Sequence, residues 1–198
     1  MTKGEQTREM ILSTAAEAFN RLGYSGTSLS DIMGLTGLEK GGIYNHFASK
    51  EELAVEAFDY AFDRVSRVML GVIRAAPRTA EAQLRAMINY FSDYIEHPPV
   101  PGGCPVLNTA VESDDANPVL RARARHAMDE WRKLVIRLVE KGISKEEFKP
   151  GMDADQVATL LLASLEGGIM LSKLYGDTSY TESVVAQMNA YVDDHLLV

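Results

Sequence analysis

Apolar residues recur every three or four positions along almost the whole chain of 198 residues, and this spacing predicts α-helices. Glycine, proline or N-capping residues separate the apolar stripes and mark helix ends. The sequence lacks a strand pattern that could carry a nucleotide-binding fold. The predicted helices cover about residues 5–22, 28–36, 39–47, 49–75, 79–96, 105–113, 117–141, 153–175 and 181–197. We therefore expect an all-α protein with about nine helices.

The most specific local pattern lies in residues 27–50. Ser28 is a good N-cap, and Asp31 follows three residues later, where a carboxylate can accept a hydrogen bond from the N–H of the cap. Gly37 stands where the end of that helix needs a residue in the left-handed conformation. A second short helix follows at once. This arrangement predicts a helix-turn-helix, although the same corner also occurs in helical cores that bind no DNA.

The second short helix begins near Glu39 and turns Ile43 and Phe47, four residues apart, toward the core. Its other positions carry little charge and offer polar groups that can meet phosphates or base edges, together with two glycines that allow close approach. These outward positions are Lys40, Gly41, Gly42, Tyr44, Asn45 and His46. The second helix of a helix-turn-helix lies in the major groove, so we expect these positions to face DNA.

The first quarter of the chain resembles the DNA-binding domain of the TetR family of transcriptional regulators. The matching residues are Ala15, Ala16, Phe19, Gly23, Tyr24, Thr27, Asp31, Ile32, Thr36, Gly37, Leu38, Lys40, Gly41, Ile43, Tyr44, His46, Phe47, Ser49, Lys50, Glu51, Glu52 and Leu53. Gly42 departs from the family, which more often has a small hydroxyl residue or alanine there. The resemblance implies a three-helix helix-turn-helix domain over residues 1–47 and a helical ligand-binding and dimerisation bundle over residues 48–198.

The resemblance implies a DNA-binding regulator, and a repressor released from a near-palindromic operator by a small molecule is the form we expect. Double-stranded operator DNA is then the expected partner. The residues expected to hold phosphates are Lys40, Tyr44, His46 and Lys50, with Thr27 and Ser28 at the start of the preceding helix. The residues expected to approach bases are Gly41, Gly42 and Asn45.

The net charge of −8, from 20 basic and 28 acidic residues, is at first sight unfavourable for DNA binding. Its distribution changes that picture, because residues 1–50 carry equal numbers of basic and acidic side chains. The excess of acid therefore lies entirely in the rest of the chain. A neutral head on an acidic body permits DNA binding that depends on correctly placed contacts.

A proline-rich stretch, H-P-P-V-P-G-G-C-P, follows the helix predicted to end near Glu96 and cannot be regular helix. It forms either the mouth of a ligand pocket or a plain connector. It contains Cys104, the one cysteine of the chain, at the start of a predicted helix, where the pKa of a thiol is lowered. Some TetR-like regulators sense electrophiles or oxidants through a cysteine in a similar region; the alternative is an inert, half-buried thiol.

Aromatic residues and methionines with few charges are the candidate walls of an effector pocket, and they predict a mainly apolar small molecule. Each of them can equally be an ordinary core residue. The candidates are Phe62, Met69, Met87, Tyr90, Phe91, Tyr94, Cys104, Leu107, Asn108, Trp131, Glu166 and Met170.

The last two predicted helices carry more apolar surface than packing within one chain is expected to cover. The helix over residues 153–175 is apolar nearly all round and contains Gly167 and Gly168, which let another backbone approach. Two such helices suit a four-helix interface between two copies of the chain. TetR-like proteins dimerise in this way, so we expect a homodimer through these helices; packing within one chain is the alternative.

Several function classes are disfavoured by what the sequence lacks. An apolar run of about 18 residues would mark a membrane span, and none occurs, nor does the N-terminus carry a signal core, so we expect a cytoplasmic protein without a membrane partner. No spacing indicates a metal or catalytic site, and we expect neither cofactor nor enzyme activity. The alternatives are a helical small-molecule carrier with a non-functional helix-turn-helix and, last, an enzyme with Cys104 as nucleophile.

Overall fold

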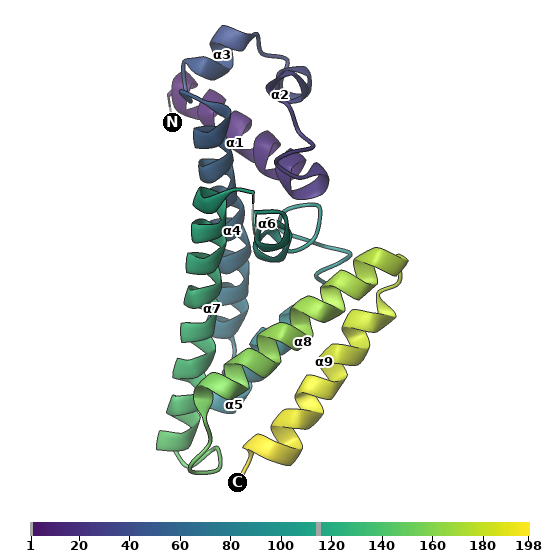
Figure 1. Ribbon diagram of the computed structural model, residues 1–198. Coiled ribbons are helices and arrows are strands. Elements are labelled where there is room, and N and C mark those ends of the chain that lie inside the picture. Colours follow the sequence, from purple (N-terminus) through teal and green to yellow (C-terminus); the bar gives the residue numbers. More distant parts are fainter. Residues whose placement is uncertain (1, 114–115) are drawn as a thin grey trace. The chain divides into compact units, whose positions relative to one another are not determined.

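The computed structural model describes residues 2–113 and 116–198, and within these ranges the chain is helical apart from turns and one isolated antiparallel bridge between Phe148 and Leu197 (Figure 1). The described residues form nine α-helices and a terminal π-helix, η1. Their bounds are α1 Lys3–Leu22, α2 Leu29–Thr36, α3 Lys40–Tyr44, α4 Lys50–Ala75, α5 Ala80–Tyr90, α6 Pro105–Ser113, α7 Pro118–Ser144, α8 Ala154–Tyr175, α9 Ser179–Tyr191 and η1 Val192–Leu196. The predicted all-α fold of about nine helices is confirmed.

Backbone contacts divide the chain into two compact units. The first unit consists of Met1–Val65 and Pro99–Ala127, and the second of Ser66–Pro98 and Met128–Val198. Helices α4 and α7 therefore each contribute residues to both units. This division describes packing and leaves the functional boundary that we placed after residue 47 as a prediction.

Helices α1 and α2 begin with capping boxes, whereas Glu39, the N-cap of α3, makes no side-chain cap bond. Ser28 and Asp31 form the predicted capping box at the start of α2, and Gly37 ends that helix in the left-handed conformation at φ 68°. Because these local bonds satisfy the backbone groups at both helix ends, α2 is specified by its own sequence. The three helices enclose the core of the first unit, together with residues from α4 and Val100: Ile11, Ala15, Ala16, Ala18, Ile32, Ile43, Phe47, Leu53, Ala57, Ala61 and Val100.

In the second unit α8 and α9 run antiparallel and side by side (Figure 1, green and yellow). The hydroxyls of Ser172 and Thr181 lie 2.7 Å apart across the pair, and Gly168 lies under α9, where a Cβ would stand 3.3 Å from the Cα of Thr181. By length and composition alone α8 could cross a membrane, but half of its apolar window is buried inside the protein. A buried core helix has this same composition, so α8 is weak evidence for a span.

Two predicted helices end differently in the structure. The helix predicted over residues 79–96 stops at Tyr90, and the chain continues in tight turns in which the N–H of Phe91 donates to Ile88 three residues back. The last predicted helix changes at Val192 into the wider π-helix. Repeating apolar residues do not distinguish these helix types, because all of them turn a stripe toward the core.

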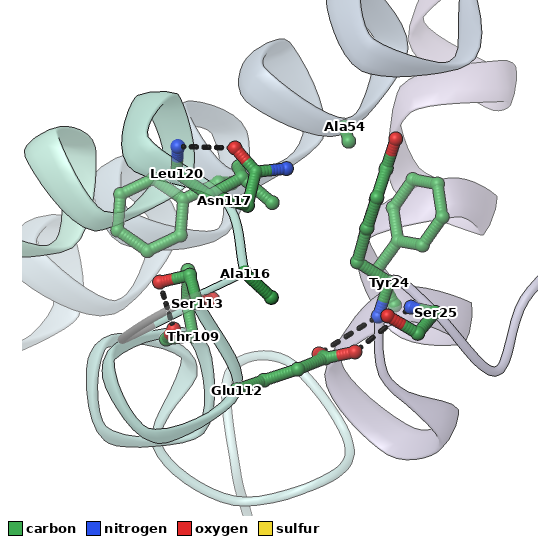
Figure 2. Close-up of a pocket in the computed structure, with 11 residues that line it drawn as sticks. Tyr24, Ser25, Ala54, Thr109, Glu112, Ser113, Ala116, Asn117 and Leu120 are labelled. Atoms are coloured by element: carbon green, nitrogen blue, oxygen red, sulfur yellow. Dashed lines mark hydrogen bonds between the residues drawn. The ribbon is translucent and has the colours of Figure 1, made fainter.

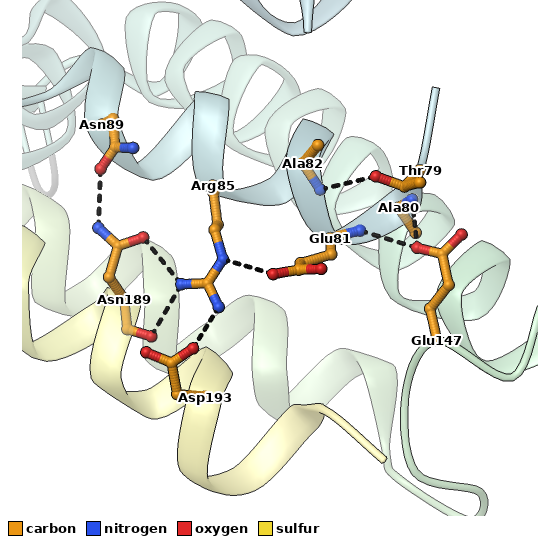
Figure 3. Close-up of polar contacts among 9 residues, drawn as sticks. All are labelled: Thr79, Ala80, Glu81, Ala82, Arg85, Asn89, Glu147, Asn189 and Asp193. Carbon is orange, nitrogen blue, oxygen red and sulfur yellow. Dashed lines mark hydrogen bonds and ion pairs between the residues drawn. The ribbon is translucent and has the colours of Figure 1, made fainter. Parts of the chain in front are cut away.

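Arg85 of α5 ties α5 to the end of α9 and the start of η1 (Figure 3). Its guanidinium donates 3.2 Å to the carbonyl of Asn189 and 2.5 Å to the carboxylate of Asp193, and 3.0 Å to Glu81 on its own helix. The planar guanidinium of arginine presents several N–H donors in a rigid geometry, so it can bind two carboxylates and a carbonyl at the same time. The place where the helix widens is therefore held by a partner more than 100 residues away in sequence.

Candidate nucleic-acid interface

One side of the short helix α3 is buried in the core of the first unit, and the other side is exposed to solvent. Ile43 and Phe47 are 2% and 1% exposed in the core of the first unit, as the spacing predicted. On the outer side Lys40, Tyr44 and Asn45 are exposed, and the ammonium of Lys40 lies 5.6 Å from the centre of the Tyr44 ring. We call Lys40, Gly41, Tyr44 and Asn45 the recognition face.

The two adjacent glycines of α3 occupy different environments. Among the described residues no heavy atom beyond the local helix backbone lies within 4 Å of a Cβ placed on Gly41, so this position opens outward. A Cβ on Gly42 would stand 3.4 Å from the Cβ of Leu38. Gly42 is half-buried and its Cβ position faces the turn before α3, because neighbouring helix positions point about 100° apart; its predicted approach to bases stays a prediction. His46 is half-buried beside Phe47, with ring centres 6.5 Å apart.

Thr27 and Ser28 differ although both precede α2. Thr27 is 0% exposed and its hydroxyl donates 2.8 Å to the carbonyl of Gly23, so the predicted phosphate contact of this hydroxyl is not supported by its position. Ser28 is exposed, and its hydroxyl and N–H both donate 2.7 Å to Asp31. These bonds lower the pKa of Asp31 below its ordinary value of 3.8. The carboxylate of Asp31 therefore contributes its full stabilisation above the ordinary pKa, and this contribution is lost as the pH falls through the lowered pKa.

Lys50, at the first position of α4, is bound within the protein. Its ammonium donates 2.6 Å to the carbonyl of Tyr24 and lies 4.0 Å from the centre of that residue's ring. The hydroxyl of Tyr24 in turn donates 3.1 Å to Glu51, and burial together with this carboxylate raises the pKa of Tyr24. Lys50 therefore holds the turn between α1 and α2, and a phosphate would compete with the Tyr24 carbonyl for its donors.

Arg8 is a structural contributor to the same region that the apolar pattern did not reveal. Its guanidinium pairs with Glu56 of α4 and lies 4.7 Å from the centre of the Phe47 ring. Arg8 thus covers the buried anchor of α3 from the side of α1. Glu56 lies 48 positions away in sequence, so no local sequence pattern predicts this ion pair.

The proline-rich loop binds to the end of α1. The side-chain amide of Asn20 donates to the carbonyls of Pro101 and Gly103, each at 2.9 Å, and the amide of Asn108 donates 2.8 Å to the side-chain oxygen of Asn20. Next to this clamp Cys104 is only 1% exposed. The thiol is therefore fully buried rather than half-buried, and a reagent reaches it only if the loop opens.

Two hollows lie among the described residues of the first unit, and none of the twelve predicted effector residues lines either of them. An open hollow of about 340 Å³ lies beside the loop and is lined by Ser13, Glu17, Tyr60, Arg64, Pro99, Val100 and Pro101. The loop thus borders a hollow whose lining is polar on the side of α1 and α4 and apolar on the side of the loop. A smaller cavity of about 70 Å³ is shown in Figure 2, lined by Phe19, Tyr24, Ser25, Ala54, Phe58, Thr109, Glu112, Ser113, Ala116, Asn117 and Leu120.

The predicted effector residues are divided between the two units. Phe62, Cys104, Leu107 and Asn108 belong to the first unit and the other eight to the second. Most of the twelve are buried and pack as core, whereas Met170 is 49% exposed on α8. Met170 is therefore no wall of an interior pocket within a single chain. In the described ranges no group of three His, Cys, Asp or Glu side chains could hold a metal ion.

Two family models match this chain, one in its N-terminal part and one in its C-terminal part. A model described as bacterial regulatory proteins, tetR family, matches residues 11–57, and a model described as tetracyclin repressor-like, C-terminal domain, matches residues 80–188. The HTH-type transcriptional regulator YxaF of Bacillus subtilis (strain 168) is 32% identical over 174 residues, which cover 87% of each chain. The HTH-type transcriptional repressor DhaR of Mycobacterium sp. (strain GP1) is 27% identical, over 84% of this chain and 82% of DhaR.

A solved structure agrees with these matches. The crystal structure of a TetR transcriptional regulator from Chloroflexus aurantiacus J-10-FL superposes with a TM-score of 0.96, is 44% identical and covers 100% of both chains. Similarity of this extent includes the helix-turn-helix, the loop and the two terminal helices.

Proposed function

The chain belongs to the TetR family of DNA-binding transcriptional regulators, and from this membership we propose that it is a repressor that leaves its operator when an effector binds. The single observation that carries the proposal for this chain is the recognition face. The exposed side chains of Lys40, Tyr44 and Asn45 lie there around Gly41, whose backbone has no side chain to cover it. Ile43 and Phe47 hold the opposite side of this segment in the core.

We assign separate roles to the residues of the recognition face. Lys40 and Tyr44 contact phosphates, which hold the helix in register, and Asn45 reaches base edges, where an amide can make paired hydrogen bonds with adenine. Gly41 lets the backbone come close to the groove. Ser28, exposed at the start of α2, adds a phosphate contact, and Lys50 and His46 act behind this face by supporting it.

The regulator acts as a homodimer through an exposed stripe on α8. This α8 stripe consists of small and apolar residues spaced three or four apart: Leu160, Ala163, Gly167, Met170 and Leu174. Leu160, Met170 and Leu174 are 41%, 49% and 70% exposed, a large amount of apolar surface for one helix in water. A second copy of the chain covers it and places two recognition faces on successive turns of a near-palindromic operator, about 34–36 Å apart.

Effector binding shifts the dimer between two spacings of the recognition faces. An effector weakens operator binding only by the difference between its affinities for the two states. The buried aromatic and methionine residues of the second unit favour a mainly apolar molecule. Modification of Cys104 is the second route to release, and its 1% exposure requires the loop to open first. The protein has no enzymatic step in this scheme and acts in the cytoplasm, where its operator lies.

Titration of the full chain against DNA from upstream of its own gene tests the proposal. We expect specific binding, with a steep loss of affinity as salt rises, because phosphate contacts release counterions. Lys40→Ala should reduce the slope of log affinity against log salt by about 2, because each of the two protomers loses one phosphate contact. Binding that does not distinguish the upstream fragment from unrelated DNA would instead favour the carrier with an inactive helix-turn-helix.

A further inference from the structure

The turn between α1 and α2 contains two backbone donors that its own residues do not satisfy. Gly23 ends α1 at φ 82°, and the N–H groups of Tyr24 and Ser25 then point away from the helix. Both donate 2.8 Å to the carboxylate of Glu112, one to each oxygen (Figure 2). Bonds from N–H groups to a charged carboxylate are among the strongest that a protein makes.

Gly23 serves this contact as well as the turn. A Cβ there would stand 2.8 Å from the nearer oxygen of Glu112, so any side chain would displace the carboxylate. The turn therefore needs glycine both for its positive φ and for the approach of Glu112.

The same turn is bound on its other side by α4. Lys50 donates 2.6 Å to the carbonyl of Tyr24, and the hydroxyl of Tyr24 donates 3.1 Å to Glu51. The backbone of Tyr24 is thus held by α6 through its N–H and by α4 through its carbonyl. Since α2 begins five residues later, the position of this turn sets where the helix-turn-helix starts.

Helix α6 is itself fixed in register against α1. Asn108 lies four residues before Glu112, on the same side of α6, and its amide donates to both oxygens of Asn20 and to the carbonyl of Gly102. A movement of α6 must therefore either carry the end of α1 and the following turn with it or break the bonds of Glu112. The cavity of about 70 Å³ beside the carboxylate gives that side chain room to turn away once the bonds break.

We propose that Glu112 is the positioning residue through which α6 sets the α1–α2 turn and hence the affinity of the recognition face for DNA. This inference rests on the proposed operator binding. A carboxylate is needed because it accepts at both oxygens, whereas an amide of the same shape has one acceptor and places an NH2 donor against the second N–H. When the pair of bonds is lost, the turn samples more positions, and DNA binding must order it again.

The decisive variant is Glu112→Gln in the full-length protein, because it keeps the size of the side chain. We expect hydrogen exchange at the amides of Tyr24 and Ser25 to become about tenfold faster or more, and operator affinity to fall about tenfold. Glu112→Asp, which keeps both oxygens, should recover part of each effect and provides the measurement if the amide variant folds poorly.

Glu147 offers a matched control. Its carboxylate also accepts two successive backbone N–H groups, from Ala80 at 2.6 Å and Glu81 at 3.0 Å, but at the start of α5 in the second unit (Figure 3). Glu147→Gln should destabilise the protein to a similar degree while leaving exchange at Tyr24 and Ser25 unchanged and operator affinity within about twofold.

The outcomes separate this inference from the proposed function. If the wild type binds the operator and Glu112→Gln matches Glu147→Gln in amide exchange or in affinity, the role of Glu112 is refuted while the repressor stands. If the wild type shows no specific operator binding, both proposals are overturned, whatever the exchange data show.

Discussion

Two glycine pairs, Gly41–Gly42 in α3 and Gly167–Gly168 in α8, have the same geometry in chemically opposite surroundings. In each pair the Cβ position of one glycine faces a neighbouring segment: that of Gly42 faces the partly buried Leu38, and that of Gly168 faces α9. The other opens outward, and among the described residues no heavy atom beyond the local helix backbone lies within 4 Å of its Cβ position. The outward glycine of α3 lies in a polar face, whereas that of α8 lies in the apolar α8 stripe.

This contrast teaches that an outward glycine indicates close approach but not what approaches. The chemistry of its neighbours decides the partner: Lys40 and Asn45 suit a phosphate backbone and base edges, whereas Leu160 and Met170 suit another apolar helix. The comparison can be tested position by position, because each pair supplies its own inward control.

The largest effect is expected from Gly167→Arg. The long charged side chain would stand in the middle of the α8 stripe and prevent a second copy from packing there, without a clash inside the chain. We expect a monomer by light scattering and a loss of operator affinity of about 10²–10⁴-fold, because the two recognition faces are no longer linked. Gly71→Arg, at an open glycine of α4, is the control and should leave the dimer intact. A dimeric Gly167→Arg protein would rule out this interface.

Gly41→Leu should act on DNA binding alone. Its side chain enters open space, so the melting temperature should stay at or above that of the wild type, while operator affinity falls about 10–100-fold because the backbone can no longer approach the groove. Fluorescence anisotropy with labelled operator measures the loss, and Gly71→Leu serves as the control for an exposed helix glycine. Unchanged affinity would remove Gly41 from the recognition face.

Gly168→Ala should destabilise the second unit. The added methyl would stand 3.3 Å from the Cα of Thr181, whose N–H donates 2.9 Å to the hydroxyl of Ser172, so α9 cannot retreat without losing that bond. Overpacking costs about 1–3 kcal/mol, which outweighs the gain of about 1 kcal/mol from replacing a helix glycine. Denaturant unfolding should therefore rank Gly168→Ala below Gly167→Ala, and the reverse order would contradict the packing described for α9.

The smallest effect is expected from Gly42→Ala. The methyl makes ordinary contact with Leu38 at 3.4 Å and should add up to about 1 kcal/mol of stability, because alanine favours helix over glycine. Operator affinity should stay within about twofold, since the added methyl points toward Leu38 and away from the recognition face. A loss as large as that of Gly41→Leu would show that both glycines approach DNA and would abolish the distinction between them.

Much of the first unit could be predicted because its signals are local. The capping box of Ser28 and Asp31, the left-handed Gly37 and the spacing of Ile43 and Phe47 each depend on residues at most four apart. The candidate site was predicted less completely. Thr27, Lys50 and Gly42 lie in or next to the predicted helix-turn-helix, but their orientation depends on partners that helix periodicity does not specify.

The proline-rich loop shows the limit most clearly. Its sequence excludes regular helix, yet whether it borders a pocket or binds another element depends on Asn20, 81 residues before Pro101. The contact of Glu112 with Tyr24 spans 88 residues and likewise has no local signature.

The sequence by itself determined where most helices begin and end, that the fold is all-α, and which family it resembles, because caps and apolar spacing act over one or two helical turns. Only the tertiary structure decided which glycine of each pair faces outward, that Cys104 is buried within the loop that Asn20 holds, and that Glu112 reaches the turn before the helix-turn-helix. Those features arise where distant segments meet, and a side chain's partner there is set by packing.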